Sequence, residues 1–119
     1  MVRDWDLIRK ILLRLEKEPE QRAAVCDDEF SGYAPAVVSY HIRLLKEAGL
    51  IHARCVPDFP NRETCVAQSL TWSGHEFLNQ IRNDNVWQQA KQKISDLGLA
   101  LTFDAVKLAV GKLIESMLD

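Results

Sequence analysis

The side chains best able to do chemistry in this chain are hydroxyls and cations between residues 39 and 62. Ser39 and Tyr40 carry hydroxyls, which both donate and accept hydrogen bonds. Guanidinium and ammonium groups, which pair with carboxylates and phosphates, are supplied by Arg43, Lys46, Arg54 and Arg62. These groups bind anions and hydrogen-bonding surfaces without breaking covalent bonds. We therefore expect a binding surface in this part of the chain.

No pattern in the sequence indicates an enzyme. It contains no phosphate loop, no metal-ligand spacing and no nucleophile–base motif. Residues one apart on a helix do not face each other, so neither the pair His75 and Glu76 nor the pair Asp27 and Asp28 can share a substrate. His75 is more simply explained as a packing or capping residue. We expect no catalytic residue, no cofactor and no metal site.

The cysteines do not form a recognisable framework. Cys26, Cys55 and Cys65 are odd in number and show no C-x-x-C spacing, so we expect free thiols. A hairpin centred near Pro60 would bring Cys55 and Cys65 opposite one another, most simply as half-buried side chains. A metal site made by these two residues with His52 is the less favoured alternative.

One amphipathic helix, predicted over residues 35–48, places most of the candidate side chains. Its apolar stripe repeats every three to four residues and consists of Val38, Ile42, Leu45 and Ala48, with Ala34, His41 and Leu44 along its edge. On the opposite side, where we expect exposure, lie Ala36, Ser39, Tyr40, Arg43 and Glu47. Gly49 then supplies the left-handed residue at which a helix commonly ends, and Leu50 the apolar contact that follows it.

The helix and its exit follow the pattern V-S-x-H-[IL]-x-x-L-x-x-A-G-L-I from Val38 to Ile51. This pattern resembles the recognition helix of bacterial winged helix-turn-helix proteins. The resemblance implies that the helix enters the major groove of DNA and that a wing at 57–63 lies against the backbone. Ser39, Tyr40 and Arg43 would then reach base edges or phosphates, and the remaining phosphate contacts would come from Lys46, Arg54 and Arg62. The alternative is a core helix with a glycine stop.

Length and composition limit the number of domains and the expected location of the protein. The chain has 119 residues, of which 47% are hydrophobic, enough for one domain with its own core. Its net charge of −2 gives no overall electrostatic case for nucleic acid. The charged start and the lack of a long apolar run predict a soluble, cytoplasmic protein that does not associate with membranes.

Before the central helix, an apolar stripe predicts a first helix over residues 4–18, with Asp4 as its N-cap and Pro19 ending it. Residues 20–33 allow two interpretations. A helix-turn-helix would place a short helix there, but Asp27, Asp28 and Ser31 fall where that helix should be apolar or small. A short strand over 21–25 followed by a loop is at least as consistent with these residues.

After the central helix, a β-hairpin is predicted, with strands over 50–56 and 64–70 around a proline-containing tip at 57–62. Thr71 or Ser73 caps the next helix, whose expected apolar contacts are Trp72, Phe77, Leu78 and Ile81. The run L-T-x-x-G-x-x-[FL]-L that begins at Leu70 recurs after the wing in many winged-helix regulators, and is a second resemblance in the expected place.

Two further helices complete the chain. The first begins at Val86, shares one face among Val86, Ala90, Ile94 and Leu97, and is closed by Gly98. The second starts at Thr102 or Asp104, and its broad stripe comprises Phe103, Val106, Ala109, Val110, Leu113, Ile114 and Met117. We expect a winged-helix domain over 1–82 and a helical extension over 83–119, which packs on that domain or forms a homodimer interface.

Nearly the whole chain resembles a family of short uncharacterised bacterial and phage proteins that start R-D-W-D-L-I, most specifically at Arg3–Asp6 and at Leu70–Leu78. The resemblance implies a mainly α fold with a small β-hairpin (α+β), a winged helix-turn-helix with a C-terminal helical hairpin, and a prophage-like setting. It implies no established biochemical activity.

The expected function is binding of double-stranded DNA, as a transcriptional regulator of the phage or prophage type. The alternative is a protein–protein interaction module on the same scaffold, which the low net charge and the acidic residues 27–29 favour. Convergence of Arg43, Lys46, Arg54 and Arg62 on one exposed face would favour DNA.

Overall fold

The computed structural model describes residues 2–19, 24–58 and 60–118. The chain divides into two compact units, Met1–His75 and Glu76–Asp119, and the division falls inside a helix. The first unit contains α1 (Trp5–Lys17), α2 (Pro35–Glu47), β1 (Ile51–Asp58), β2 (Arg62–Leu70) and the start of α3 (Trp72–Ile81). The second contains the rest of α3, α4 (Asp84–Asp96) and α5 (Phe103–Leu118). The predicted α+β class is confirmed, and the arrangement is consistent with a winged-helix-like fold.

The first helix begins and ends as its sequence predicts. The Asp4 carboxylate accepts the backbone N–H of Leu7 at 3.1 Å, which satisfies one of the donors that a helix start leaves unpaired. The helix ends at Lys17, two residues before Pro19. Its inward side is fully apolar and comprises Trp5, Leu7, Ile8, Ile11, Leu12 and Leu15.

A buried histidine joins α1 to α2. The Nε2 atom of His41 accepts the backbone N–H of Asp4 at 2.8 Å. Its Nδ1 atom lies 2.8 Å from the carbonyl oxygen of Val37, so Nδ1 carries the proton and donates it there. The helical period places His41 only at the edge of the apolar stripe. It is fully buried, and burial is tolerated because both ring nitrogens have partners.

The segment between α1 and α2 resolves the two interpretations as far as it is described. Residues 24–34 form turns and contain no helix, while residues 20–23 lie outside the described part of the chain. Val25 is fully buried and forms an isolated antiparallel bridge to Ala67 of β2, with paired N–H to carbonyl bonds of 2.8 and 3.0 Å. The strand-and-loop interpretation therefore holds at Val25, and the first helix of a standard helix-turn-helix is absent from 24–34.

The exit of α2 is a two-bond cap built on Gly49. Gly49 has φ +77°, its N–H binds the carbonyl of Lys46, and the N–H of Leu50 reaches back to the carbonyl of Leu45. Leu50 is buried and leads directly into β1. The predicted helix stop is confirmed.

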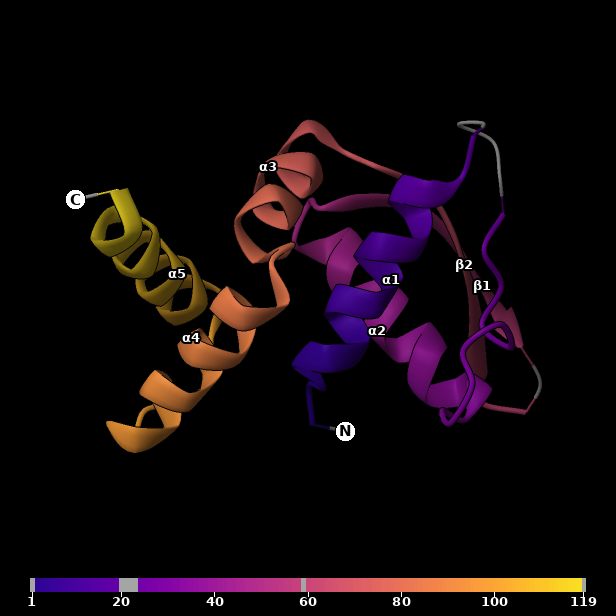
Figure 1. The fold of residues 1–119 in the computed structure, drawn as a ribbon. Coiled ribbons are helices and arrows are strands. Elements are labelled where there is room, and N and C mark those ends of the chain that lie inside the picture. Colours follow the sequence, from indigo (N-terminus) through magenta and orange to yellow (C-terminus); the bar gives the residue numbers. More distant parts are fainter. Residues whose placement is uncertain (1, 20–23, 59, 119) are drawn as a thin grey trace. The chain divides into compact units, whose positions relative to one another are not determined.

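The hairpin packs on both helices of the first unit. β1 and β2 pair antiparallel, with a register irregularity between His52 and Ala53, and Figure 1 shows α1 and α2 lying along one side of this sheet. The face toward the helices carries the buried side chains of Ile51, Cys65 and Ala67. The opposite face is open to solvent. Phe59, at the predicted tip, lies outside the described residues.

The L-T-x-x-G run locks the start of α3 against the exit of α2. The Thr71 hydroxyl donates to the carbonyl of Gly49 at 2.6 Å and accepts the N–H of Gly74 at 3.0 Å. A Cβ atom on Gly74 would lie 1.9 Å from the carbonyl oxygen of Leu50, so only glycine permits this approach. Trp72, expected as an apolar contact, is the first residue of α3 and is 81% exposed, which corrects that expectation.

The second unit is a helical hairpin with a small core. Asn83 caps α4 through a 3.1 Å bond to the N–H of Val86, and Gly98 ends the helix region at φ +71°. The ring centroids of Phe77 and Phe103 lie 4.7 Å apart, with the ring planes tilted by 39°. The buried side chains of this unit also include Trp87, Ala90, Ile94, Val106 and Val110. Leu97 was expected to share the buried face of α4 but is 65% exposed, because it is the C-cap residue, where the helix ends. None of the helices in the described part of the chain has the length and apolar character needed to cross a bilayer.

Candidate functional site

The outer side of α2 and the hairpin beside it carry the side chains predicted to bind. Arg43 and Lys46 are on the outer side of α2, as expected, with Arg43 exposed and Lys46 on the same edge one turn on. Tyr40 is half-buried, and its ring meets the His41 ring edge-on at 5.6 Å between centroids. The phenol therefore lies at the border between the core and the outer side of α2, in an edge-to-face contact with His41.

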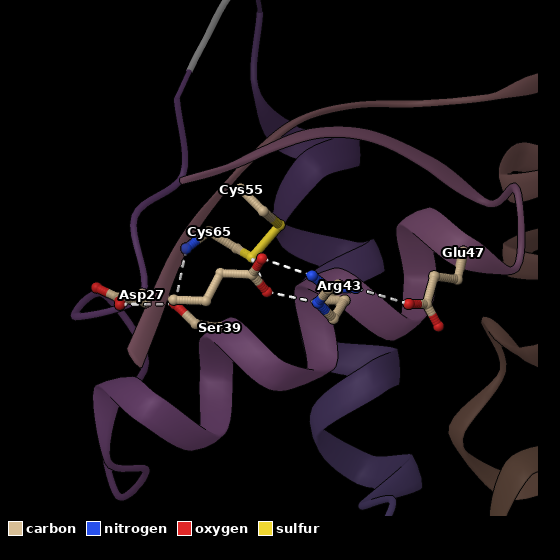
Figure 2. The surroundings of a disulfide bond; sticks show 7 residues. Asp27, Ser39, Arg43, Glu47, Cys55 and Cys65 are labelled. Carbon is tan, nitrogen blue, oxygen red and sulfur yellow. Dashed lines mark hydrogen bonds and ion pairs between the residues drawn. A yellow bond between two sulfur atoms is a disulfide. The ribbon is translucent and has the colours of Figure 1, made fainter. Parts of the chain in front are cut away.

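Ser39 does not belong to this outer side, which corrects our expectation. Its side chain is only 2% exposed. The hydroxyl donates to a carboxylate oxygen of Asp27 at 2.7 Å and accepts the backbone N–H of Cys65 at 2.9 Å (Figure 2). The Ser39 hydroxyl therefore uses both its donor and its acceptor capacity within the chain. It is not available to an external ligand.

This arrangement completes the free edge of β2. Val25 pairs with Ala67 at that edge, and the loop after Val25 then turns away from it. The N–H of Cys65, two residues before Ala67, would lack a strand partner, and buried backbone donors almost always have one. The Ser39 hydroxyl takes that place, and Asp27 in turn accepts the hydroxyl proton. A helix side chain thus replaces a missing strand residue.

Arg43 is paired within the chain. Its Nε and Nη2 atoms lie 2.5 and 2.6 Å from the two carboxylate oxygens of Glu63 on β2, and its Nη1 atom lies 2.9 Å from Glu47 one helical turn on (Figure 2). The hydrogen bonds that Arg43 donates to Glu63, and then the one to Glu47, raise the pKa of Arg43, and the bonds that Glu63 accepts from Arg43 lower the pKa of Glu63. The charge on Arg43 is therefore balanced by two carboxylates, only one of which was on the expected helix.

The remaining cations lie on different surfaces. Cys55 pairs with Cys65 and Asp58 with Arg62 in the hairpin register. Because successive strand residues point to opposite faces, Arg54 lies on the face opposite Cys55, and Arg62 on the face opposite Glu63. Arg43 and Lys46 stand on α2, which packs against the inner face. The four cations therefore do not converge on one surface.

Cys55 and Cys65 form a disulfide, which corrects the expectation of free thiols. The register brings them directly opposite, with Cα atoms 4.1 Å apart, in the close type of antiparallel pair. The predicted hairpin centred near Pro60 already placed the two residues opposite one another, and the register confirms that placement. Only the bond between them was not expected. Bonded to each other, the two sulfurs offer no thiolate to a metal. Cys26 is free and exposed.

The ligand atoms of Cys26, Asp28 and Glu29 lie within 4.8 Å of one another on the loop before α2. Glu29 already binds the N–H of Cys26 and the guanidinium of Arg14, at 2.5 and 2.7 Å. Burial and the nearby carboxylates raise the pKa of the Cys26 thiol, which keeps it protonated. Of the three side chains, Glu29 is therefore already engaged by Arg14 and by the Cys26 backbone.

A polar cavity of about 330 Å³ lies between the end of α1, the base of the hairpin and the start of α3. His52, His75, Glu16 and Glu18 are among its lining residues. His75 is exposed, so the packing role that we expected as one of two explanations is wrong. These side chains are not among the described groups whose ligand atoms gather closely enough to hold a metal ion.

Sequence reasoning missed Glu63 and Asp27, the two partners that decide what α2 can offer. The sequence does contain an indication for Glu63. It stands two residues from Cys65 and so lies on the same, inner face of β2. Asp27 has none, because its contact with Ser39 depends on how the loop folds back.

Comparisons with known proteins support the family resemblance without adding an activity. A Haemophilus influenzae protein described as "Uncharacterized protein" is 45% identical over 118 residues, which cover 99% of each chain. No solved structure matches this chain. The family model described as "Hypothetical protein (DUF2513)" matches residues 2–100, and the chain belongs to that family.

Proposed function

We propose that this chain binds double-stranded DNA through a winged-helix-like first unit and acts as a transcriptional regulator of the phage or prophage type. The observation that supports the proposal is that α2 is held in place along its inner side and carries cations on its outer side. Its inner side is fixed to α1 by His41 and to β2 by Ser39, while its outer side carries Arg43 and Lys46. A rigid helix with an outward cationic edge beside a hairpin is the arrangement that enters a major groove.

The ion pairs of Arg43 are compatible with this role. All three partners, Arg43, Glu47 and Glu63, lie at the surface, where ion pairs are screened and contribute little to stability. A guanidinium binds phosphate with the same two-bond geometry that it uses for a carboxylate. A DNA phosphate would therefore compete with Glu63 for Arg43.

Two substitutions test this competition in opposite directions. The binding of a labelled DNA duplex, followed by fluorescence anisotropy at about 50 mM salt, should weaken in Arg43→Ala and tighten in Glu63→Gln, which releases Arg43. Glu115→Gln on α5 is the matched control, since it makes the same change in net charge in the second unit. We expect its affinity to stay near that of the wild type.

No measurable binding by the wild type under these conditions would refute the proposal, because non-specific attraction to a cationic surface is already visible at low salt. Equal tightening in Glu63→Gln and Glu115→Gln would also contradict it, since the effect would then come from net charge alone. A mobility-shift screen with DNA flanking the gene then identifies the target sequence.

A second candidate function is a protein–protein interaction module, favoured by one specific observation. The charges of Arg43 and Lys46 are nearly balanced by Glu47 and Glu63, and the hairpin arginines lie on the other face. A surface of mixed charge suits a protein partner better than a polyanion. Site-specific photo-crosslinking from the Tyr40 position in the host cell tests it. One protein crosslinked in the wild type and lost in Arg43→Glu, with no DNA binding in vitro, supports this function.

A further inference from the structure

The second unit has an apolar groove that its own core does not fill. The groove lies between the end of α4 and the first half of α5 and has a volume of about 130 Å³. Its walls include Leu97, Leu99 and Leu108, which are 65%, 58% and 63% exposed. Lys93 and Lys112 also line it. Large aliphatic side chains gathered at one exposed place commonly mark an interaction surface.

α5 has two apolar sides where an ordinary surface helix has one. Val106 and Val110 are fully buried against the rest of the unit. The groove side instead carries Ala105, Leu108 and Ala109, followed by Lys112, at spacings of three and four residues. This second side is therefore a continuous stripe along α5, and its small alanines permit another helix to approach closely.

We propose that the stripe is covered by a second copy of this chain, with α5 lying antiparallel to the same helix of the partner subunit across a two-fold axis near Leu108 and Ala109. The charges of α5 itself support this occupant, because Asp104 stands in its first turn and Lys112 about two turns further on. An antiparallel crossing centred between residues 108 and 109 brings Lys112 beside Ala105 of the partner subunit and its neighbour Asp104. The two-fold axis repeats the same cation–anion contact on the other side, so one helix supplies both members of the pair.

The dimer goes beyond the proposed function, because it holds whether or not the first unit binds DNA. Its apolar centre is Leu108, flanked in the groove by Leu97 and Leu99. In each copy the exposed leucines would leave water, and burial of apolar surface is the main drive for association. The pair formed by Lys112 and Asp104 would fix the antiparallel direction, as charged pairs at the rim of an interface do.

The first test is the mass of the full chain in solution by gel filtration with light scattering. We expect about twice the 13.6 kDa of one chain for the wild type, and 13.6 kDa for Leu108→Lys. Met117→Lys is the matched control, because Met117 lies on the same helix, is 59% exposed and does not line the groove. It should remain dimeric. Circular dichroism confirms that each variant keeps its helices.

A charge exchange tests the identity and direction of the occupant. Asp104→Lys and Lys112→Asp should each weaken self-association about tenfold or more, because each places like charges together twice in the dimer. The double variant Asp104→Lys with Lys112→Asp should recover most of the loss. Only an antiparallel second copy predicts this recovery.

Three results would overturn the proposal. A wild-type mass of 13.6 kDa at every concentration means that the groove is not covered by a second copy. A dimer that survives Leu108→Lys means that the interface lies elsewhere. Failure of the double variant to recover would exclude the antiparallel pairing. DNA affinity plays no part in these measurements, so their failure is distinguishable from failure of the proposed function.

Discussion

The guanidinium of Arg43 and the carboxylate of Glu63 form a two-bond ion pair, 2.5 and 2.6 Å long, that ties the middle of α2 to β2. The pair connects the helix proposed to contact DNA with the hairpin beside it. Its partners are separated by twenty residues, so it also reports whether helix and hairpin are correctly assembled.

The pair predicts a low titration midpoint for Glu63. Hydrogen bonds from Arg43 are the main cause that lowers its pKa, and the more distant charge of Lys46 adds least. The contribution of the pair to folding is complete above the ordinary glutamate pKa, about 4.3, and is lost as the pH falls through the lower value of the folded protein. NMR titration of the Glu63 carboxyl carbon should show a midpoint below the ordinary value, rising markedly in Arg43→Ala and only slightly in Lys46→Ala. Equal rises in both variants would contradict the bonded geometry.

The surroundings of the glycines predict the order in which their substitutions destabilise the fold. The positions of the glycines in the sequence would not predict this order. Gly74→Ala should be the most damaging, by about 3 kcal/mol or more, because its Cβ would collide with the Leu50 carbonyl. Gly49→Ala meets no atom within 4 Å, and its cost, about 1 kcal/mol, comes only from the left-handed backbone at φ +77°. Gly49→Val should cost at least as much, because a β-branched residue is the most strained there.

Gly111→Ala is the control for this series. Gly111 lies inside α5, a Cβ atom added to it would meet no atom within 4 Å, and its backbone is free of left-handed strain. Alanine should therefore stabilise its helix by about 0.5–1 kcal/mol. Urea unfolding followed by circular dichroism measures all four variants. A Gly74→Ala protein as stable as Gly49→Ala would rule out the close approach of α3 to Leu50.

Ser39→Ala is predicted to destabilise the fold rather than to alter binding preference. It leaves the buried N–H of Cys65 without an acceptor and removes one partner of Asp27, at a cost of about 1–3 kcal/mol. Ser31→Ala, a change of the same kind at an exposed site, should stay within about 0.5 kcal/mol of the wild type. Hydrogen exchange at the Cys65 amide should accelerate in Ser39→Ala alone. Unchanged stability with altered DNA preference would restore the exposed position that we first expected.

These cases show which parts of the molecule the sequence could predict. The Asp4 cap, the Gly49 exit and the hairpin depend on residues close together in the chain, and each was confirmed. Ser39 was misplaced because it neighbours Val38 at the border of the apolar stripe, where a helical period cannot decide between core and solvent. Its partners lie twelve and twenty-six residues away. Glu63 was missed for the same reason: the charge balance of α2 depends on a contact made only after folding.

The disulfide predicts a redox-dependent stability of the hairpin. Cys55 and Cys65 are separated by ten residues, and a bond that closes a loop of this size restricts the unfolded chain by about 2–3 kcal/mol. Reduction of the wild type should lower its midpoint of urea unfolding, while Cys55→Ser should be low from the start and insensitive to reductant. Cys26→Ser should behave as the wild type, because Cys26 is exposed and takes no part in the disulfide. Equal midpoints for the oxidised and reduced wild type would contradict a stabilising bond.

The final prediction concerns the salt dependence of DNA binding and follows from the positions of the cations. Each phosphate neutralised by a cation contributes about −0.9 to the slope of log K against log salt. If all four predicted cations of each subunit in a dimer contacted phosphates, the slope would approach about −7. The hairpin register turns Arg54 and Arg62 away from the face on which α2 packs, which leaves Arg43 and Lys46 on the binding side. We therefore expect a slope of about −4 for the dimer and about −2 for the Leu108→Lys monomer. Arg54→Ala should leave both slopes unchanged, whereas Lys46→Ala should make each one shallower. A slope near −7 that becomes shallower in Arg54→Ala would instead show that the outer face of the hairpin contacts the DNA backbone.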